Sequence, residues 1–185
     1  INEIIHISVA FWKNEFTREY KKIFSERYPE LDVTIMQDSF DDFQWLEIFK
    51  KGVSKYKGIF KISQIENIEN KDIIEALKEL KPDFFVTFAF GQILSQEVLD
   101  IPKYETINLH VSLLPKYRGA NPIQRATING DKKTGICTMI TELGLDCGDI
   151  CMKYPIEITK NMNCVELFEL CASNSPELLE KTLIG

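Results

Sequence analysis

The sequence predicts an α/β protein built on an open, mostly parallel twisted sheet flanked by helices, with an antiparallel pair of strands near its C-terminal end. Strand-like and helical segments alternate through the first 110 residues, and this order favours parallel strands joined by helices. Residues 83–89 form a nearly continuous apolar run, which is typical of a central strand covered on both faces. Two further strand segments, 135–141 and 150–158, are expected to form the antiparallel pair.

The first part of the chain predicts a strand, a helix and another strand. Ile4–Phe11 is β-rich and mostly apolar, as a buried first strand should be. Asn14–Arg27 carries its apolar residues at helical spacing, and Asn14 can cap the start of that helix. Leu31–Met36 alternates between apolar and polar residues, which predicts a strand.

The rest of the chain supplies the remaining elements. Asn70–Leu80 is an amphipathic helix that ends before Pro82, because proline restricts the residue ahead of it. Strands follow at Asp83–Ala89 and Thr106–His110, and Asn163–Leu183 is the final amphipathic helix.

Composition and charge indicate a single globular domain over residues 1–185. Hydrophobic residues make up 44% of the 185 residues and charged residues 27%, which is ordinary globular usage. The formal net charge of −6 argues against a free-standing nucleic-acid-binding module. No apolar run approaches the roughly 18 residues of a membrane span, and the N-terminus lacks a signal-peptide pattern. We therefore expect a cytoplasmic protein.

Cysteine and histidine usage limits the chemistry further. There are five cysteines, an odd number without a CxxC pair, which favours reduced thiols in a cytosol. Only two histidines are present, His6 and His110, and no set of residues has metal-ligand spacing. No metal site is expected.

Three segments are expected to carry the functional residues. In open α/β sheets, ligands bind in the crevice beyond the carboxyl ends of the strands. The segments that follow Phe88, His110 and Thr141 are predicted to lie there.

A polar pair occupies the second of these places. Asn108 and His110 are two residues apart on a predicted strand, so their side chains project to the same face. An amide and an imidazole side by side can both address one developing oxyanion, and the imidazole can also move protons near neutral pH. A hydrogen-bonded polar pair without a catalytic role fits the same pattern.

A carboxylate occupies the third place. Asp146 lies between Gly144 and Gly148, in a loop whose glycines allow sharp bends and close approach to a ligand. Asp149 is its alternative, and a solvated turn explains either residue equally simply.

Together these residues resemble a known family. Residues 108–119 read N-x-H-x-S-L-L-P-x-Y-R-G and residues 145–148 read L-D-x-G, a combination similar to that of the folate-dependent formyltransferases. The runs ANPIQRA at 120–126 and AFGQIL at 89–94 are most similar to the methionyl-tRNA formyltransferase branch. The resemblance covers residues 70 to 183 well. It implies a Rossmann-like catalytic domain, with the family's C-terminal β-barrel domain lying outside this chain.

The resemblance implies transfer of a formyl group from 10-formyltetrahydrofolate to the amino group of initiator methionyl-tRNA, without a metal and with a monomer favoured. Asn108, His110 and Asp146 would stabilise the tetrahedral intermediate and relay protons. The folate pocket would be formed by two segments, which are Phe88, Ala89, Phe90, Gly91, Gln92, Ile93 and Leu94, and Ile140, Thr141, Glu142, Leu143, Gly144 and Leu145. Within the first, Phe88, Ile93 and Leu94 would contact the faces of the pterin ring.

Candidate acceptor-side residues come from two further stretches. Pro115 fixes a turn, Leu113 and Leu114 are most simply core residues, and Arg118 is suited to hold either a phosphate or a backbone carbonyl. Basic and aromatic residues interleaved after position 49 can grip a phosphate backbone, or can simply form a solvated lysine face on a helix and loop. The candidates are Ser112, Leu113, Leu114, Pro115 and Arg118, with Lys50, Lys51, Lys55 and Lys57.

Two departures from the family pattern keep other acceptors open. Phe11–Phe16 lacks the usual Gly/Pro-containing turn, and Gln37–Phe43 is acidic where a basic insertion is usual. A sugar-nucleotide N-formyltransferase is therefore the alternative. A glycinamide ribonucleotide formyltransferase and a non-catalytic folate-binding domain are less favoured.

Overall fold

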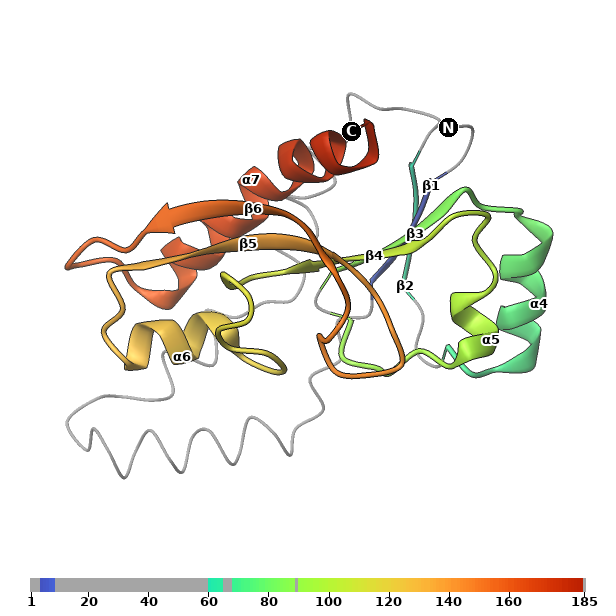
Figure 1. Ribbon diagram of the computed structural model, residues 1–185, viewed down its shortest axis with the longest axis horizontal. Helices are drawn as coiled ribbons and strands as arrows, with labels where there is room; N and C mark the ends of the chain where they lie inside the picture. Colours follow the sequence, from blue (N-terminus) through green and yellow to red (C-terminus); the bar gives the residue numbers. More distant parts are fainter. Residues whose placement is uncertain (1–3, 9–59, 65–67, 89, 185) are drawn as a thin grey trace.

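The computed structural model describes residues 4–8, 60–64, 68–88 and 90–184. These residues form a six-stranded open sheet with strand order β2-β1-β3-β4-β5-β6 (Figure 1). Neighbouring strands are parallel through the first four, which are β1 (Ile4–Ser8), β2 (Phe60–Gln64), β3 (Phe84–Phe88) and β4 (Thr106–His110). β5 (Lys133–Ile140) runs antiparallel to β4, and β6 (Ile150–Glu157) antiparallel to β5. The predicted architecture is confirmed.

The described helices fall into two groups. Beside β3 lie α4 (Lys71–Glu79) and α5 (Gln96–Leu99), while α6 (Pro122–Ile128) and α7 (Cys164–Ile184) lie beside the antiparallel strands (Figure 1). α7 contacts β5 and β6, and α6 contacts both α7 and β5.

Most element boundaries agree with the sequence to within two residues. The helix expected at 70–80 is α4, whose start is capped by Asn70: its Oδ1 accepts a hydrogen bond from the backbone N of Asp72 at 2.9 Å. The strand expected at 106–110 has those bounds. The expected elements at 14–27 and 31–36, and the end of the first strand, lie outside the described residues.

Three short elements were not predicted. β2 lies in a stretch for which the sequence predicted a helix and loop or a basic segment. α5 is a single helical turn of four residues. α6 begins at Pro122 after Asn121, whose backbone is in the left-handed region with φ 58°. Segments this short contain too few residues to display a period.

The two faces of the sheet are covered differently. On the first face, Val86 of β3 and Leu109 of β4 are buried against Ile123 of α6 and Leu167 of α7. On the second face, Phe85 of β3 is buried in a separate cluster with α4 and α5. Phe85 and Val86 are both fully buried, so the apolar run at 83–89 is covered on both sides, as expected.

A third apolar cluster lies further along the second face. Cys137 and Met139 of β5 are buried with Leu114. These two residues pair with His110 and Asn108 of β4, so all four side chains project to the second face. The polar residues of β4 therefore lie between two separate apolar clusters.

A glycine on β5 allows the segment after β4 to pack closely onto the sheet. A Cβ built on Gly135 would lie 2.6 Å from Leu113 Cδ2 and inside van der Waals contact with the carbonyl oxygen of Tyr154. Only glycine permits this approach.

We predict that Gly135→Ala lowers the free energy of unfolding by about 3 kcal/mol, because a backbone carbonyl cannot rotate away from the added methyl. Chemical denaturation measures the change. Gly130→Ala is the control, since a Cβ there meets nothing within 4 Å and the cost is only that of its left-handed φ of 66°, about 1 kcal/mol. Equal losses in the two variants would contradict the close approach.

Candidate active site

The second face of the sheet holds a row of polar side chains at the ends of β3 and β4. Thr87 of β3 is paired in register with Asn108 of β4, and its Oγ1 donates a hydrogen bond to Asn108 Oδ1 at 3.0 Å. His110 follows two residues later on the same face, as the period of a strand requires. The expected pairing of Asn108 with His110 on one face is thus present in the structure.

The Asp146 side chain contacts two members of this row, Asn108 and His110. Its Oδ2 accepts a hydrogen bond from the backbone N of Gly119 at 2.7 Å and lies 3.3 Å from His110 Nδ1. Its Oδ1 accepts from Asn108 Nδ2 at 3.3 Å. The Asp146 side chain is 14% exposed, so these contacts replace most of its hydration. Asp149, the alternative from the sequence, is exposed.

Strand polarity does not explain how Asp146 arrives there. Since β5 runs antiparallel to β4, its last residue, Ile140, is paired with Ile107 rather than with the carboxyl end of β4. The rule for parallel strands that placed the loop after Thr141 at the carboxyl edge therefore does not apply. The loop instead folds back toward Asn108 and His110. The left-handed backbone of Asp146, with φ 48°, is part of this turn.

Both nitrogens of the His110 ring are engaged. Nδ1 faces the Asp146 carboxylate, and Nε2 lies 2.9 Å from the backbone carbonyl oxygen of Tyr117. Both partners are acceptors, so the two contacts are satisfied together only when both ring nitrogens carry protons. The residue is 6% exposed, and the ring is therefore fixed in orientation.

The segment after β4 is held to the fold through several of its residues. Ser112 is fully buried and its Oγ donates to the carbonyl oxygen of Lys116 at 2.5 Å. Leu114 is 2% exposed, its carbonyl accepts from Lys153 Nζ at 2.6 Å, and its bond to Pro115 is cis. Ser112 and Leu114 therefore have structural roles, which corrects their assignment as substrate-contacting residues. Leu113 packs against Gly135. Pro115 and Arg118 are exposed.

A cluster of charged and aromatic side chains anchors the far end of this segment. The Tyr117 hydroxyl donates to Asp131 Oδ2 at 2.8 Å, and Lys116 forms an ion pair with the same oxygen at 2.7 Å. Arg125 lies over the Tyr117 ring at 5.1 Å. Burial raises the pKa of the Asp131 carboxyl, but the hydrogen bonds from Lys116 and Tyr117 outweigh it and hold that pKa below its ordinary value. Lys116 and Arg125 both lie over the Tyr117 ring, and with the exposed neighbouring residue Arg118 they form a basic rim around Tyr117.

The two segments expected to bind folate are only partly available to a ligand. Phe88 is 1% exposed and Leu94 3%, and each belongs to an apolar cluster. Contrary to the expectation from the sequence, neither side chain is available to contact the face of a pterin ring. Phe90 is buried as well, Gln92 Oε1 accepts from the backbone N of Ile68, and Ala89 lies outside the described residues. Gly91 is exposed, with φ 62°. Ile93, by contrast, is 71% exposed.

The loop after β5 adds two more exposed aliphatic side chains. Leu143 is 58% and Leu145 65% exposed, and Leu145 lies against Gly119. Ile140 and Thr141 are half-buried, and Glu142 and Gly144 are exposed. Figure 1 shows this loop and the segment after β3 extending from the same side of the sheet. Large exposed apolar side chains on otherwise polar loops are suited to cover a ligand.

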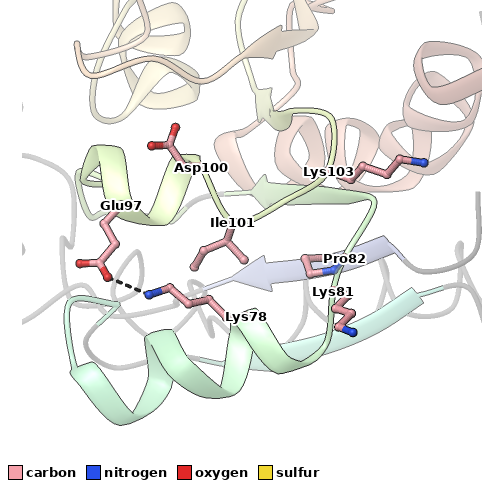
Figure 2. A pocket seen from close by; sticks show the side chains of 7 residues that line it. All are labelled: Lys78, Lys81, Pro82, Glu97, Asp100, Ile101 and Lys103. Atoms are coloured by element: carbon pink, nitrogen blue, oxygen red, sulfur yellow. Dashed lines mark hydrogen bonds and ion pairs between the residues drawn. The ribbon is translucent and has the colours of Figure 1, made fainter.

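Two surface hollows lie apart from the catalytic candidates. One of about 650 Å³ is lined by the start of β4 and by Ile140–Leu143, and so includes part of the loop after β5. Another, of about 750 Å³, is shown in Figure 2, where Lys78 of α4 pairs with Glu97 of α5 at 2.9 Å across it. Lys81 and Pro82 in its wall lie shortly before β3 in the chain, which places this hollow at the amino end of that strand.

Within the part of the chain that the structure describes, no three or more His, Cys, Asp or Glu side chains gather to hold a metal ion. No helix in the same residues combines the length and apolar character needed to cross a membrane. Lys50, Lys51, Lys55 and Lys57, the basic acceptor candidates, lie outside the described residues.

Comparison with known proteins links this geometry to one family. The family described as formyl transferase matches residues 47–183. The methionyl-tRNA formyltransferase of Clostridium beijerinckii is 54% identical over 117 residues, which are 63% of this chain and 38% of that protein. The chain thus spans about two fifths of the curated relatives it matches.

Solved structures share the fold. HypX from Aquifex aeolicus in complex with tetrahydrofolic acid superposes with a TM-score of 0.69 at 15% identity, over 98% of this chain and 26% of that one. A methionyl-tRNA formyltransferase from Clostridium thermocellum gives 0.60 at 21% identity, over 97% of this chain and 65% of that one. At these identities the likeness concerns the fold alone.

We predict that a thiol reagent at neutral pH labels Cys147, next to Asp146, faster than any other cysteine of the chain. Cys147 and Cys151 are exposed, but partial burial and the nearby Asp149 raise the pKa of Cys151. Burial raises the pKa of Cys171 to about 12 and also that of Cys137 and Cys164, so these three should react only after unfolding. Peptide mapping of the label measures the order. Labelling of Cys171 in the native protein at the rate of Cys147 would contradict it.

Proposed function

The chain belongs to the formyl transferase family, and we propose that it carries the active site for transfer of a formyl group from 10-formyltetrahydrofolate to the amino group of initiator methionyl-tRNA. The observation that carries the proposal is the Asp146 carboxylate in contact with both Asn108 and His110. The names of the curated relatives support the acceptor. The reaction belongs to the start of translation, so we assign it to the cytoplasm.

Each of the three side chains has a task in such a transfer. When bound, the folate would supply the formyl carbon that the acceptor amine attacks. Asn108 Nδ2 has a second hydrogen beyond the one directed at Asp146, and this hydrogen is suited to stabilise negative charge on the formyl oxygen. His110 Nε2 is a further donor at the site, and the Asp146 carboxylate beside Nδ1 is suited to accept a proton directly or through water.

The exposed aliphatic side chains fit the donor better than the segment assigned from the sequence. A pterin ring needs apolar contact on its faces and hydrogen bonds along its edge. Ile93, Leu143 and Leu145 offer the apolar contact, and the exposed backbone around Gly91 and Gly144 offers peptide groups. Phe88 and Leu94 belong instead to the two large apolar clusters of the core.

The basic rim supports a phosphate-bearing acceptor, as a tRNA is. Lys116, Arg118 and Arg125 surround Tyr117, whose carbonyl contacts His110, so an acceptor end at the site would bring its phosphates to these cations. This local charge favours a phosphate-bearing acceptor in a chain whose net charge is −6.

The direct test is formyl transfer by the complete protein that contains this chain. With 10-formyltetrahydrofolate as donor, we expect formylation of charged initiator methionyl-tRNA, and no formylation of amino-sugar nucleotides or glycinamide ribonucleotide above background. Transfer to an amino sugar alone would support the sugar-nucleotide alternative. Binding of folate without transfer to any acceptor would reject catalysis.

We predict that Asp146→Asn lowers kcat about 10²–10⁴-fold with a modest effect on folate binding, because an amide, unlike a carboxylate, cannot accept a proton. Asp149→Asn is the matched control and should stay within a few-fold of wild type, since the Asp149 side chain is exposed, unlike the Asp146 carboxylate. Steady-state kinetics with donor varied separates kcat from KM. Equal losses in the two variants would show that the wrong carboxylate had been identified.

A further inference from the structure

Thr87 is the polar residue in a strand that is otherwise apolar. β3 reads Phe-Phe-Val-Thr-Phe, and every residue after the first is buried. Thr87 is 3% exposed, and its hydroxyl donates to Asn108 Oδ1 at 3.0 Å. The hydroxyl projects from the middle of the sheet toward the site that holds Asn108, His110 and Asp146.

This hydrogen bond bears on the orientation of the Asn108 side-chain amide. A terminal amide has two orientations related by a half-turn, nearly equal in shape, that exchange its oxygen and its NH₂ group. Asp146 Oδ1 lies 3.3 Å from the amide on one side, and an ionised carboxylate only accepts hydrogen bonds. The NH₂ group therefore belongs toward Asp146.

The Asn108 carbonyl oxygen then faces Thr87 and requires a donor there. A threonine hydroxyl supplies one at the correct distance, whereas a valine of the same shape would leave the oxygen without a partner on that side. The opposite orientation would place two oxygens, Asn108 Oδ1 and Asp146 Oδ1, against each other. Asp146 thus sets the orientation of the amide, and the Thr87 hydroxyl holds the carbonyl oxygen from the opposite side.

We propose that Thr87 is a positioning residue for formyl transfer: its hydroxyl holds the Asn108 amide in the orientation that Asp146 sets, so that both N–H bonds are directed toward Asp146 and the reacting oxygen. This proposal rests on the proposed function of the site. The strand register supports the proposal independently, because the backbone pairing of β3 with β4 places Thr87 beside Asn108 without any contribution from the loops. Nothing in the sequence pattern separated Thr87 from an ordinary β-branched strand residue.

The test compares Thr87→Val, which removes the hydroxyl and keeps the shape, with Thr87→Ser, which keeps the hydroxyl. Removing an oxyanion donor costs about 10²–10³-fold in kcat, so misdirecting one should cost about tenfold or more. We expect that loss in kcat for Thr87→Val with KM for the folate donor little changed, and activity within about threefold of wild type for Thr87→Ser. Equal activities in the two variants would overturn the proposal.

Thr138→Val is the control for stability. Thr138 is a fully buried threonine on β5 that shares a hydrogen bond of 2.7 Å with Thr182 of α7, and its side chain lies on the opposite face of the sheet from Asn108. It loses a comparable buried hydroxyl, so we expect a comparable fall in thermal stability with kcat unchanged. A fall in kcat in proportion to stability in both variants would reduce Thr87 to a packing residue and reject the positioning role.

A double-mutant cycle and a structural readout complete the test. In an Asn108→Ala background, Thr87→Val should lower kcat no further, and additive losses would overturn the proposal. The side-chain NH₂ signals of Asn108, identified by their loss in Asn108→Ala, should shift in the NMR spectrum of Thr87→Val and not of Thr138→Val. This readout needs no turnover. A failed formylation assay with the expected shift would reject the proposed function alone, and unshifted signals would reject the role of Thr87.

Discussion

The carboxylate of Asp146 is the interaction on which the site depends. It is a nearly buried acceptor, and its contacts come from residues that lie 27 to 38 positions earlier in the chain: the side chains of Asn108 and His110 on β4, and the backbone N of Gly119. A carboxylate removed from water at 14% exposure is stable only while such donors surround it. The same contacts therefore hold the loop after β5 over the sheet and fix the two catalytic candidates. Fold and chemistry share one set of hydrogen bonds.

The sheet can accommodate this polar group because its second face is not covered continuously. One apolar cluster covers the second face near α4 and α5, and another covers it where Leu114 meets β5. Thr87, Asn108 and His110 lie between them, and the first face of the same strands is fully covered by α6 and α7. The strands that carry the polar row are thus rigid because of the face that the site does not use. Preorganisation of this kind is what stabilisation of developing charge requires.

Regular periodicity was enough to predict most of the fold and half of the site. A period of two placed Asn108 and His110 on one face, and apolar runs identified the strands at 83–89 and 106–110. Asp146 could be chosen over Asp149 only through the family resemblance, because its contacts cross 27 to 38 residues of sequence and depend on a loop that strand polarity alone would have sent elsewhere. The prediction that the Phe88 and Leu94 side chains contact the pterin ring disagrees with their burial. A sequence motif does not distinguish a residue that lines a pocket from one that lies in the core beneath it. Thr87 was missed for the opposite reason: threonine is common in strands, and its role appears only in the register with Asn108.

The arrangement around His110 bears on how the proposed site would distinguish a reacting oxygen from a resting one. In the structure the Nε2 donor is occupied by the neutral carbonyl of Tyr117, held in place by the contacts of Tyr117 and Lys116 with Asp131. A neutral peptide oxygen is a weaker acceptor than an oxygen that gains charge during reaction. Substrate carbonyls would compete poorly for this donor, and the same oxygen would compete well once negative charge develops on it. The gain in binding would then fall on the transition state rather than on the ground state, which is the condition for an interaction to raise kcat rather than merely to lower KM.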